Sequence, residues 1–188
     1  MKTIILGITG SIAAYKAAEV ANALTKEGIG VEVIMTAGAR RFITPLTLQI
    51  LSKRKVHVDM FEEYIPDEVR HISLAKKADL ALVAPATANI IGKLASGIAD
   101  DMLSTTLLAL RGKPILICPA MNTAMYENPA VQDNIARLKG RGCLFVEPRE
   151  ALLACGDLGK GALADVEHIL EAVRGLDKSP CLCYATLT

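Results

Sequence analysis

The chain has 188 residues, of which 52% are hydrophobic, 22% are charged and only 4% are aromatic. A chain of this length can form one compact domain with a sizeable core. Its 21 basic and 20 acidic residues give a net charge of +1, so charge provides no argument for binding to nucleic acid or to a membrane. No apolar run reaches the roughly 18 residues of a membrane-spanning helix. Five scattered cysteines, an odd number, favour reduced thiols in a cytoplasmic protein over a disulfide framework.

Strands and helices are predicted to alternate along the chain. Six apolar segments bounded by glycine or proline are the predicted strands: 3–8, 31–36, 55–60, 79–85, 113–119 and 143–148. The predicted helices lie near residues 11–26, 38–51, 87–96, 100–110 and 128–139. This alternation predicts an α/β fold, a Rossmann-like, doubly wound parallel sheet in one domain over residues 1–175. Residues 176–188 have weak periodicity and a Ser-Pro break, and we expect them to form a tail.

The turn after the first predicted strand, GITGSIAAYK, has the features of a phosphate-binding site. Gly10 and Ser11 stand where a helix begins, and its free N–H groups and dipole favour an anion there. An ordinary helix N-cap is the alternative role for Ser11. The G-x-G-x-x-G and G-K-[ST] motifs are absent, and Thr36 occupies the strand end where NAD-binding proteins place an acidic residue. The turn therefore favours a mononucleotide over NAD or ATP.

Two further loops follow predicted strands, and the carboxyl ends of parallel strands are where α/β proteins bind ligands. In APATANIIGK, small residues leave room for a flat ring, while Thr87 and Asn89 offer short-range hydrogen bonds. Capping of the next helix is the alternative role for Thr87. In CPAMNTAMYENPAV, Asn122 lies between two methionines, and the alternative there is a turn before a helix beginning near Glu127. Both loops are candidate ligand sites.

Four stretches occur in order over about residues 1–175: GSIAAYK, MTAGARRF, HISLAKKADLALVAPATANIIGKLASGIADD and PAMNTAMYENP. Together they closely resemble the flavin-dependent cysteine decarboxylases, which are homo-oligomeric FMN proteins with a flavodoxin-like three-layer fold. The PAMNxxM motif and the spacing from the histidine to PATAN are specific to that family. LLACGDLGKGALAD (152–165) resembles the substrate-clamp segment of one branch. That branch decarboxylates 4'-phosphopantothenoylcysteine to 4'-phosphopantetheine in coenzyme A biosynthesis.

The clamp segment departs from the family pattern, which often reads G-x-G-R-M, because Ala162 and Leu163 follow Gly161. The missing arginine keeps open a second hypothesis, a peptidyl-cysteine decarboxylase that forms a C-terminal enethiol on a peptide. A flavin-binding regulatory subunit is a third, but such relatives usually carry long acidic extensions. Flavin prenyltransferases share the fold but lack PAMN. The CTP-dependent ligase half of the bifunctional bacterial enzymes is absent, so we expect a decarboxylase unit alone, either natural or truncated.

Decarboxylation of a cysteine needs an electron sink, which oxidation of the thiol to a thioaldehyde provides, and FMN can accept the two electrons. The resemblance implies three catalytic residues. His71 matches an active-site histidine, whose imidazole suits a base that helps to oxidise the thiol. Asn122 matches the asparagine that holds the substrate carboxylate, and Cys155 matches the proton donor that completes reduction of the enethiol. The structural alternatives are a surface histidine that caps a helix and a small buried cysteine.

The resemblance also implies FMN contacts at the carboxyl ends of the strands. From the phosphate end onward, the expected residues are Gly10, Ser11, Ile12, Thr36, Ala37, Gly38, Thr87, Ala88, Asn89, Ile90 and Ala120. In the family the flavin lies between the subunits of a trimer, sometimes built into a dodecamer, so we expect a homotrimer or dodecamer here. Cys181 and Cys183 are too few for a metal site, and we predict no metal. We expect His57, His168, Cys118 and Cys143 to be structural.

Overall fold

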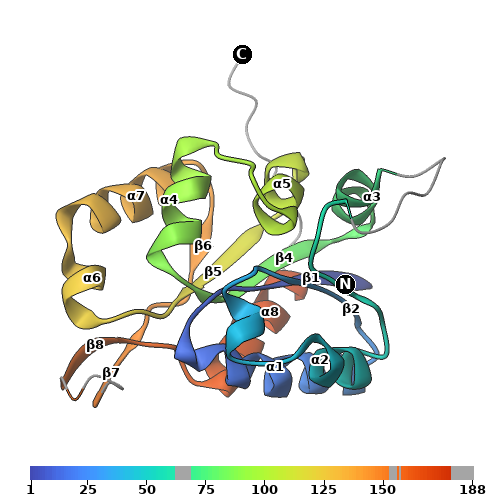
Figure 1. Cartoon of the computed structure of the whole chain (residues 1–188), viewed down its shortest axis with the longest axis horizontal. Helices are drawn as coiled ribbons and strands as arrows, with labels where there is room; N and C mark the ends of the chain where they lie inside the picture. The colour runs from blue at the N-terminus through green and yellow to red at the C-terminus, as the bar shows by residue number, and fades with distance from the viewer. Residues whose placement is uncertain (62–68, 153–155, 157, 179–188) are drawn as a thin grey trace.

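The computed structural model describes residues 1–61, 69–152, 156 and 158–178 (Figure 1). A six-stranded sheet forms its centre, with the strands β1 (Thr3–Ile8), β2 (Gly30–Met35), β3 (Val56–His57), β4 (Leu80–Ala86), β5 (Ile115–Pro119) and β6 (Leu144–Phe145). Their order is β3-β2-β1-β4-β5-β6, and all neighbouring pairs are parallel. The strand order reverses between β1 and β4, which is the doubly wound arrangement. The predicted fold class is confirmed.

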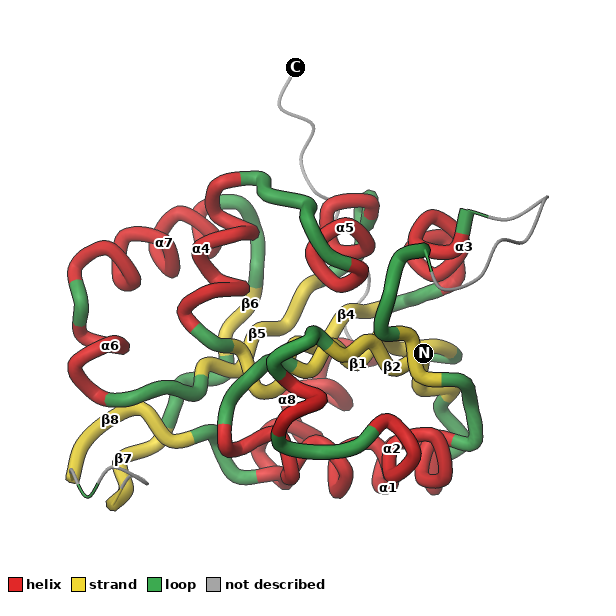
Figure 2. Tube along the Cα trace, in the orientation of Figure 1, coloured by secondary structure: helices red, strands yellow, loops and turns green. Residues whose placement is uncertain are grey.

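Helices cover both faces of the sheet (Figures 1 and 2). One face carries η1 (Ile12–Tyr15), α1 (Lys16–Lys26), η2 (Ala39–Arg41), α2 (Pro45–Ser52) and α8 (Val166–Lys178). The other carries α3 (Arg70–Lys77), α4 (Ala88–Ser96), α5 (Met102–Ala109) and α7 (Pro129–Gly140). The short helix α6 (Thr123–Glu127) follows β5, and an antiparallel hairpin of β7 (Arg149–Leu152) and β8 (Leu158–Ala162) lies against it. No helix in the described part of the chain is long and apolar enough to cross a membrane.

The central strand β1 divides its side chains between two cores. Ile4, Leu6 and Ile8 pack on the side of α1 and α8, whereas Ile5 packs on the side of α4 and α5. All residues of β1 are buried, as a parallel sheet covered on both faces requires. This double burial explains the continuous apolar runs in the sequence.

The structure differs from the sequence prediction mainly at the sheet edges and the helix starts. β3 and β6 are short because each is an edge strand with one paired neighbour. The helix expected over 38–51 is divided, because α2 begins only at Pro45. Neither α3, α8 nor the β7–β8 hairpin was predicted. α8 continues to Lys178, past residue 175, where we expected the tail to begin.

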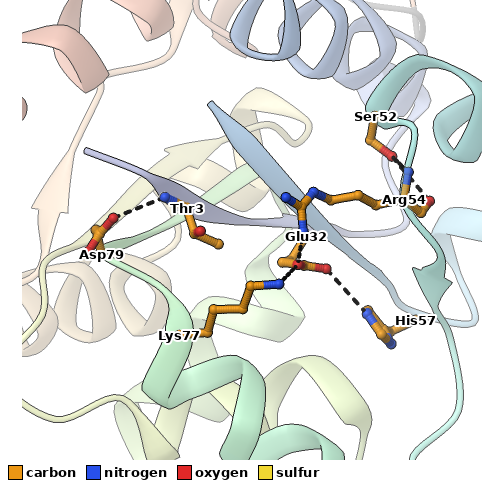
Figure 3. Close-up of polar contacts among 7 residues, drawn as sticks. All are labelled: Thr3, Glu32, Ser52, Arg54, His57, Lys77 and Asp79. Atoms are coloured by element: carbon orange, nitrogen blue, oxygen red, sulfur yellow. Dashed lines mark hydrogen bonds and ion pairs between the residues drawn. The ribbon is translucent and has the colours of Figure 1, made fainter. Parts of the chain in front are cut away.

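A buried carboxylate on β2 joins the edge of the sheet to α3, the helix that carries His71 (Figure 3). The Glu32 side chain is 8% exposed and accepts hydrogen bonds from Arg54 Nη1 at 2.7 Å and Lys77 Nζ at 2.5 Å. Nε2 of His57 lies 3.7 Å from Glu32 Oε2. His57, Lys77 and Arg54 lower the pKa of Glu32 from its ordinary value of 4.5 to about 2, against desolvation, which raises it. The contacts fix α3 to β2 and give His57 the structural role we expected.

We expect Glu32 to account for part of the acid sensitivity of the fold. Because its folded pKa of about 2 is below the ordinary value of 4.5, its contribution is complete above pH 4.5 and is lost as the pH falls toward 2. The shift corresponds to about 3 kcal/mol by proton linkage. In urea unfolding, the free energy of unfolding of Glu32→Gln should therefore decrease less steeply below about pH 5 than that of the wild type. Glu19→Gln, at an exposed site on α1, should follow the wild type; an unchanged acid slope in Glu32→Gln would contradict the assignment.

Candidate active site

A cavity of about 500 Å³ lies at the carboxyl ends of β1, β4 and β5, next to the β7–β8 hairpin. Its volume is in the range of about 300–1,000 Å³ that is usual for cofactor and ligand sites. The lining includes one predicted catalytic residue and five predicted FMN residues: Asn122, Gly10, Ser11, Ile12, Thr87 and Ala120. These residues come from three loops that are distant in sequence, so the fold brings together the ligand loops that the sequence indicated.

The first turn has the geometry of an anion cradle. Ser11 is the N-cap of η1, and its Oγ accepts a hydrogen bond from Ala13 N at 3.4 Å, so the alternative capping role is observed and the phosphate role stays a prediction. A Cβ on Gly10 would lie 3.1 Å from the backbone of Gly38, so the loop after β2 lies directly against this turn. The close backbone approach, the helix start and the absence of carboxylates among the described lining residues fit the phosphate of FMN.

Six of the predicted FMN residues do not line the cavity: Thr36, Ala37, Gly38, Ala88, Asn89 and Ile90. Residues 36–38 adjoin it through the contact between Gly38 and Gly10. Residues 88–90 form the first turn of α4, where the Ile90 side chain is 1% exposed and packs in the core. Its side chain therefore serves packing, and any ligand contact at Ile90 would have to come from the backbone. The FMN roles of these six residues stay predictions.

Thr9 is a site-positioning residue that the sequence analysis missed. Its buried Oγ1 donates to Pro85 O at 2.7 Å and accepts the N–H of Thr87 at 3.0 Å. One hydroxyl thus joins the end of β1 to the loop after β4 and fixes Thr87 at the cavity. The sequence feature that could have identified Thr9 is a hydroxyl side chain directly after a predominantly apolar strand.

Asn122 is both a helix cap and a lining residue of the cavity. Its Oδ1 accepts a hydrogen bond from Ala124 N at 2.8 Å, which begins α6 at Thr123 rather than near Glu127. This bond determines which end of the amide is the oxygen. The NH2 end is then the group suited to donate to a carboxylate, which an amide can orient without neutralising. The capping role and the predicted ligand role are therefore compatible.

Two glycines allow β8 to lie directly against the loop that contains Asn122. Met121 N donates to Gly161 O at 3.0 Å, and a Cβ on Gly161 would overlap the carbonyl oxygen of Met121. A Cβ on Gly159 would lie 2.6 Å from Thr123 Oγ1. The hairpin forms one wall of the cavity because these two positions lack side chains.

We expect Gly161→Ala to displace the hairpin, because the new methyl group meets a backbone carbonyl that cannot move away cheaply. The free energy of unfolding should fall by roughly 1–3 kcal/mol, as in other overpacked sites. Turnover should fall with it, because a wall of the cavity shifts. Gly175→Ala in α8 is the control, since its Cβ would meet nothing within 4 Å. Urea unfolding and steady-state rates provide the measurement, and a Gly161→Ala variant as stable and active as wild type would contradict this role.

The structure does not bring His71, one of the other two predicted catalytic residues, to Asn122. His71 lies half-buried in the first turn of α3 and does not line the cavity. Figure 2 shows α3 and the β7–β8 hairpin at opposite ends of the view. Cys155 lies outside the described residues. Within one chain, the cavity therefore contains Asn122 without His71.

The two described cysteines do not belong to the cavity. Cys118 is fully buried in β5, and desolvation raises the pKa of its thiol. Cys143 is half-buried against the core, and burial also raises the pKa of its thiol. The predicted structural role of both cysteines is confirmed.

The sheet topology, the glycine turn and the cavity together define the class of protein. It is an α/β protein with a nucleotide site where the strand order reverses, between β1 and β4. Residues 1–177 match the Flavoprotein family, and the chain belongs to that family. It is 50% identical over 173 residues to a probable phosphopantothenoylcysteine decarboxylase of Streptococcus mutans, covering 92% of this chain and 97% of the relative. It is 51% identical over 170 residues to the coenzyme A biosynthesis bifunctional protein CoaBC of Bacillus subtilis, covering 90% of this chain but only 42% of that protein.

Solved structures agree with the sequence relatives. A cysteine-to-serine mutant of PPC decarboxylase complexed with pantothenoylaminoethenethiol has a TM-score of 0.86 and 32% identity, covering 95% of this chain and 99% of that one. The FMN-dependent cysteine decarboxylase SpaF has a TM-score of 0.77 and 32% identity, covering 92% of this chain and 98% of that one. The peptidyl-cysteine decarboxylase EpiD has a TM-score of 0.78 and 26% identity. Both substrate classes considered from the sequence therefore occur on this fold.

Proposed function

We propose that this protein is an FMN-dependent carboxy-lyase that converts phosphopantothenoylcysteine to phosphopantetheine. The observation that carries the proposal is the cavity in which the turn at residues 10–12 and Asn122 face one space. The turn suits the phosphate of a mononucleotide, and the amide suits a substrate carboxylate. The 50% identity to the Streptococcus mutans decarboxylase, which extends over 97% of that relative, supports this choice of substrate. We also place the enzyme in the cytoplasm, because unpaired Cys118 and Cys143 fit a reducing compartment.

The chemistry requires that the substrate thiol be oxidised before carbon dioxide can leave. FMN, when bound, supplies the two-electron acceptor and later returns the hydride. Loss of a hydride from Cβ and a proton from sulfur gives a thioaldehyde, whose C=S group is β to the carboxylate. The C–C bond then breaks, carbon dioxide leaves, and its electron pair is held as an enethiolate. Hydride return to one carbon and protonation of the other give the saturated thiolate, which takes up a further proton at sulfur to become the thiol.

The residues of the chain bind, orient and transfer protons in this scheme. Asn122 donates to the carboxylate and keeps it ionised, which favours loss of carbon dioxide. His71 accepts the thiol proton, and Cys155 donates the proton that completes the reduction. The PPC decarboxylase neighbour complexed with pantothenoylaminoethenethiol supports an enethiol as the intermediate of this scheme. The β7–β8 hairpin forms one wall of the cavity and limits the access of water to the thioaldehyde from that side.

We further propose that the active form is a homotrimer, alone or within a dodecamer, in which His71 of one copy completes the cavity of another. Two facts about the single chain support this arrangement. His71 does not line the cavity that contains Asn122. Large apolar side chains at and near the cavity are also exposed, among them Ile12 at 59% and Tyr15 at 55%. Burial of such side chains against a second copy is favourable.

A peptidyl-cysteine decarboxylase that stops at the enethiol is the second candidate function. Two observations favour it: the similarity to the peptidyl-cysteine decarboxylase EpiD, and Ala162 in place of the clamp arginine. The two functions predict different products from different substrates.

The experiment that tests the proposal compares both substrates on one preparation. The purified protein should be yellow, with about one FMN per chain released on denaturation. It should convert phosphopantothenoylcysteine to a saturated product, identified by mass, and leave a peptide ending in cysteine unchanged. Conversion of the peptide alone would establish the second candidate, and a protein that cannot be loaded with FMN would exclude both.

A further inference from the structure

We propose that Arg149 binds the phosphate of the substrate and replaces, from β7, the arginine that the clamp segment lacks. The inference rests on the proposed function, because it names the group that selects the phosphorylated substrate. The sequence analysis did not single out Arg149, and none of the proposed steps uses it.

The register of the hairpin places Arg149 beside the position of the missing arginine. Arg149 pairs directly with Ala162 across the two strands. Side chains of directly opposed residues lie on the same face of a β-ladder, with Cβ atoms about 5 Å apart. Both residues line the cavity. A cation on β7 can therefore reach the space that an arginine at position 162 would occupy.

Lys160, the other basic residue of the hairpin, makes contacts away from the cavity. Lys160 Nζ pairs with Glu147 Oε2 at 3.0 Å and lies 5.5 Å from the centre of the Tyr126 ring, and it does not line the cavity. Arg149, Ala151 and Leu152 of β7 line the cavity, whereas Glu150 does not, and the ladder is irregular between Arg149 and Glu150. Of the two basic side chains of the hairpin, Arg149 therefore lines the cavity and Lys160 does not.

The contacts of Arg149 orient its guanidinium and leave donors for a ligand. Nε donates to Leu163 O at 3.3 Å and lies 3.2 Å from Asp165 Oδ1. Among the described residues, its two Nη groups have no hydrogen-bond partner. Asp165 is 67% exposed, and an exposed ion pair of this kind neutralises little of the charge in water. Two parallel N–H donors match the geometry of a phosphate.

The charged side chains that line the cavity indicate which ligand group Arg149 binds. Its described lining includes two cations, Lys16 and Arg149, and no carboxylate. Lys16 begins α1, directly after η1 and the turn that suits the flavin phosphate. Asn122, on the loop after β5, suits the substrate carboxylate. The remaining anionic group of phosphopantothenoylcysteine is its phosphate, and Arg149 is the remaining cation.

The test compares Arg149→Gln, Arg149→Lys and the control Lys160→Gln on two substrates, phosphopantothenoylcysteine and the same molecule without its phosphate. Arg149→Gln should lower kcat/KM for the phosphorylated substrate about tenfold or more, mainly through KM. Its rate with the dephosphorylated substrate and its FMN content should stay close to wild type. Arg149→Lys should recover part of the loss, and Lys160→Gln should keep the wild-type preference for phosphate. Equal losses on both substrates, or a loss of FMN, would overturn the inference.

A binding measurement separates this inference from the proposed function. Calorimetric titration of the FMN-loaded protein with phosphopantothenate and with pantothenate needs no turnover. We expect wild type to bind phosphopantothenate more tightly and Arg149→Gln to lose that difference. If wild type binds in this way but does not decarboxylate, the proposed function fails and the role of Arg149 stands. If wild type does not distinguish the two ligands, the role of Arg149 fails whatever the turnover.

Discussion

Replacing His71 with asparagine is expected to abolish turnover, and replacing Asn122 with aspartate is expected to do nearly the same. Asparagine cannot accept the thiol proton near neutral pH, so the oxidation that precedes carbon dioxide loss stops. Aspartate places a second carboxylate where we propose that the substrate carboxylate binds, and the two like charges would repel each other. Single-turnover measurements with the FMN-loaded variants should show no product. Near-normal rates in either variant would remove that residue from the site.

Both variants should retain FMN and stability, since neither residue belongs to the phosphate turn. Aspartate is also a good N-cap, so Asn122→Asp keeps the hydrogen bond that begins α6. The variant thus removes the ligand role of Asn122 while preserving its structural role. Asn128→Asp is the matched control, because Asn128 caps α7 by the same bond to Ala130 N but does not line the cavity. Its turnover should stay close to wild type.

Mixing the two inactive variants tests whether His71 and Asn122 meet across an interface. A mixed oligomer contains copies with wild-type His71 beside copies with wild-type Asn122. If each site takes one residue from each of two copies, random assembly restores roughly a quarter of the sites. Co-expressed variants should therefore recover activity that neither has alone. No recovery in verified mixed oligomers would contradict the proposed sharing of the site.

The fold was predictable because its strands are buried on both faces and therefore appear in the sequence as continuous apolar runs. β1 and β4 lie at the centre of the sheet, and their burial decides their structure locally. The β7–β8 hairpin has no such signal, since REAL and LGKGA lack a regular apolar pattern. Its position depends on contacts with residues 121–123, which are distant in sequence. Long-range contacts of this kind cannot be inferred from the local pattern of one sequence.

The same distinction explains which site residues were predictable. Ser11, Thr87 and Asn122 lie within three residues of the ends of parallel strands, and such positions gather at one edge of the sheet whatever the details of packing. The family resemblance placed Ile90 with them; helical periodicity turns its side chain into the core, and its FMN role stays a prediction. Arg149 was missed because its place at the cavity comes from its pairing with Ala162. The role of such a residue follows from register, which the structure supplies.

The fate of the enethiol distinguishes the two candidate functions, and Cys155 is the residue on which it depends. An enzyme that makes phosphopantetheine must add a hydride and a proton to the enethiol, so it needs an acid in the site. Serine resembles cysteine in size but has a much higher pKa, and it is therefore a poor proton donor. Cys155→Ser should still release carbon dioxide, because the thiol oxidation and C–C cleavage precede the step that needs this proton.

We therefore expect Cys155→Ser to accumulate a product about 2 Da lighter than phosphopantetheine, the difference of one hydride and one proton. Mass spectrometry of the product, together with trapped carbon dioxide, provides the measurement. If Cys155 only packs, the variant should make the saturated product and lose at most roughly 1 kcal/mol of stability. Cys143→Ser is the control, since that thiol is half-buried against the core and does not line the cavity. Should the wild type itself stop at the lighter product, the chain lacks the final reduction, and the peptidyl-cysteine decarboxylase becomes the better description of its chemistry.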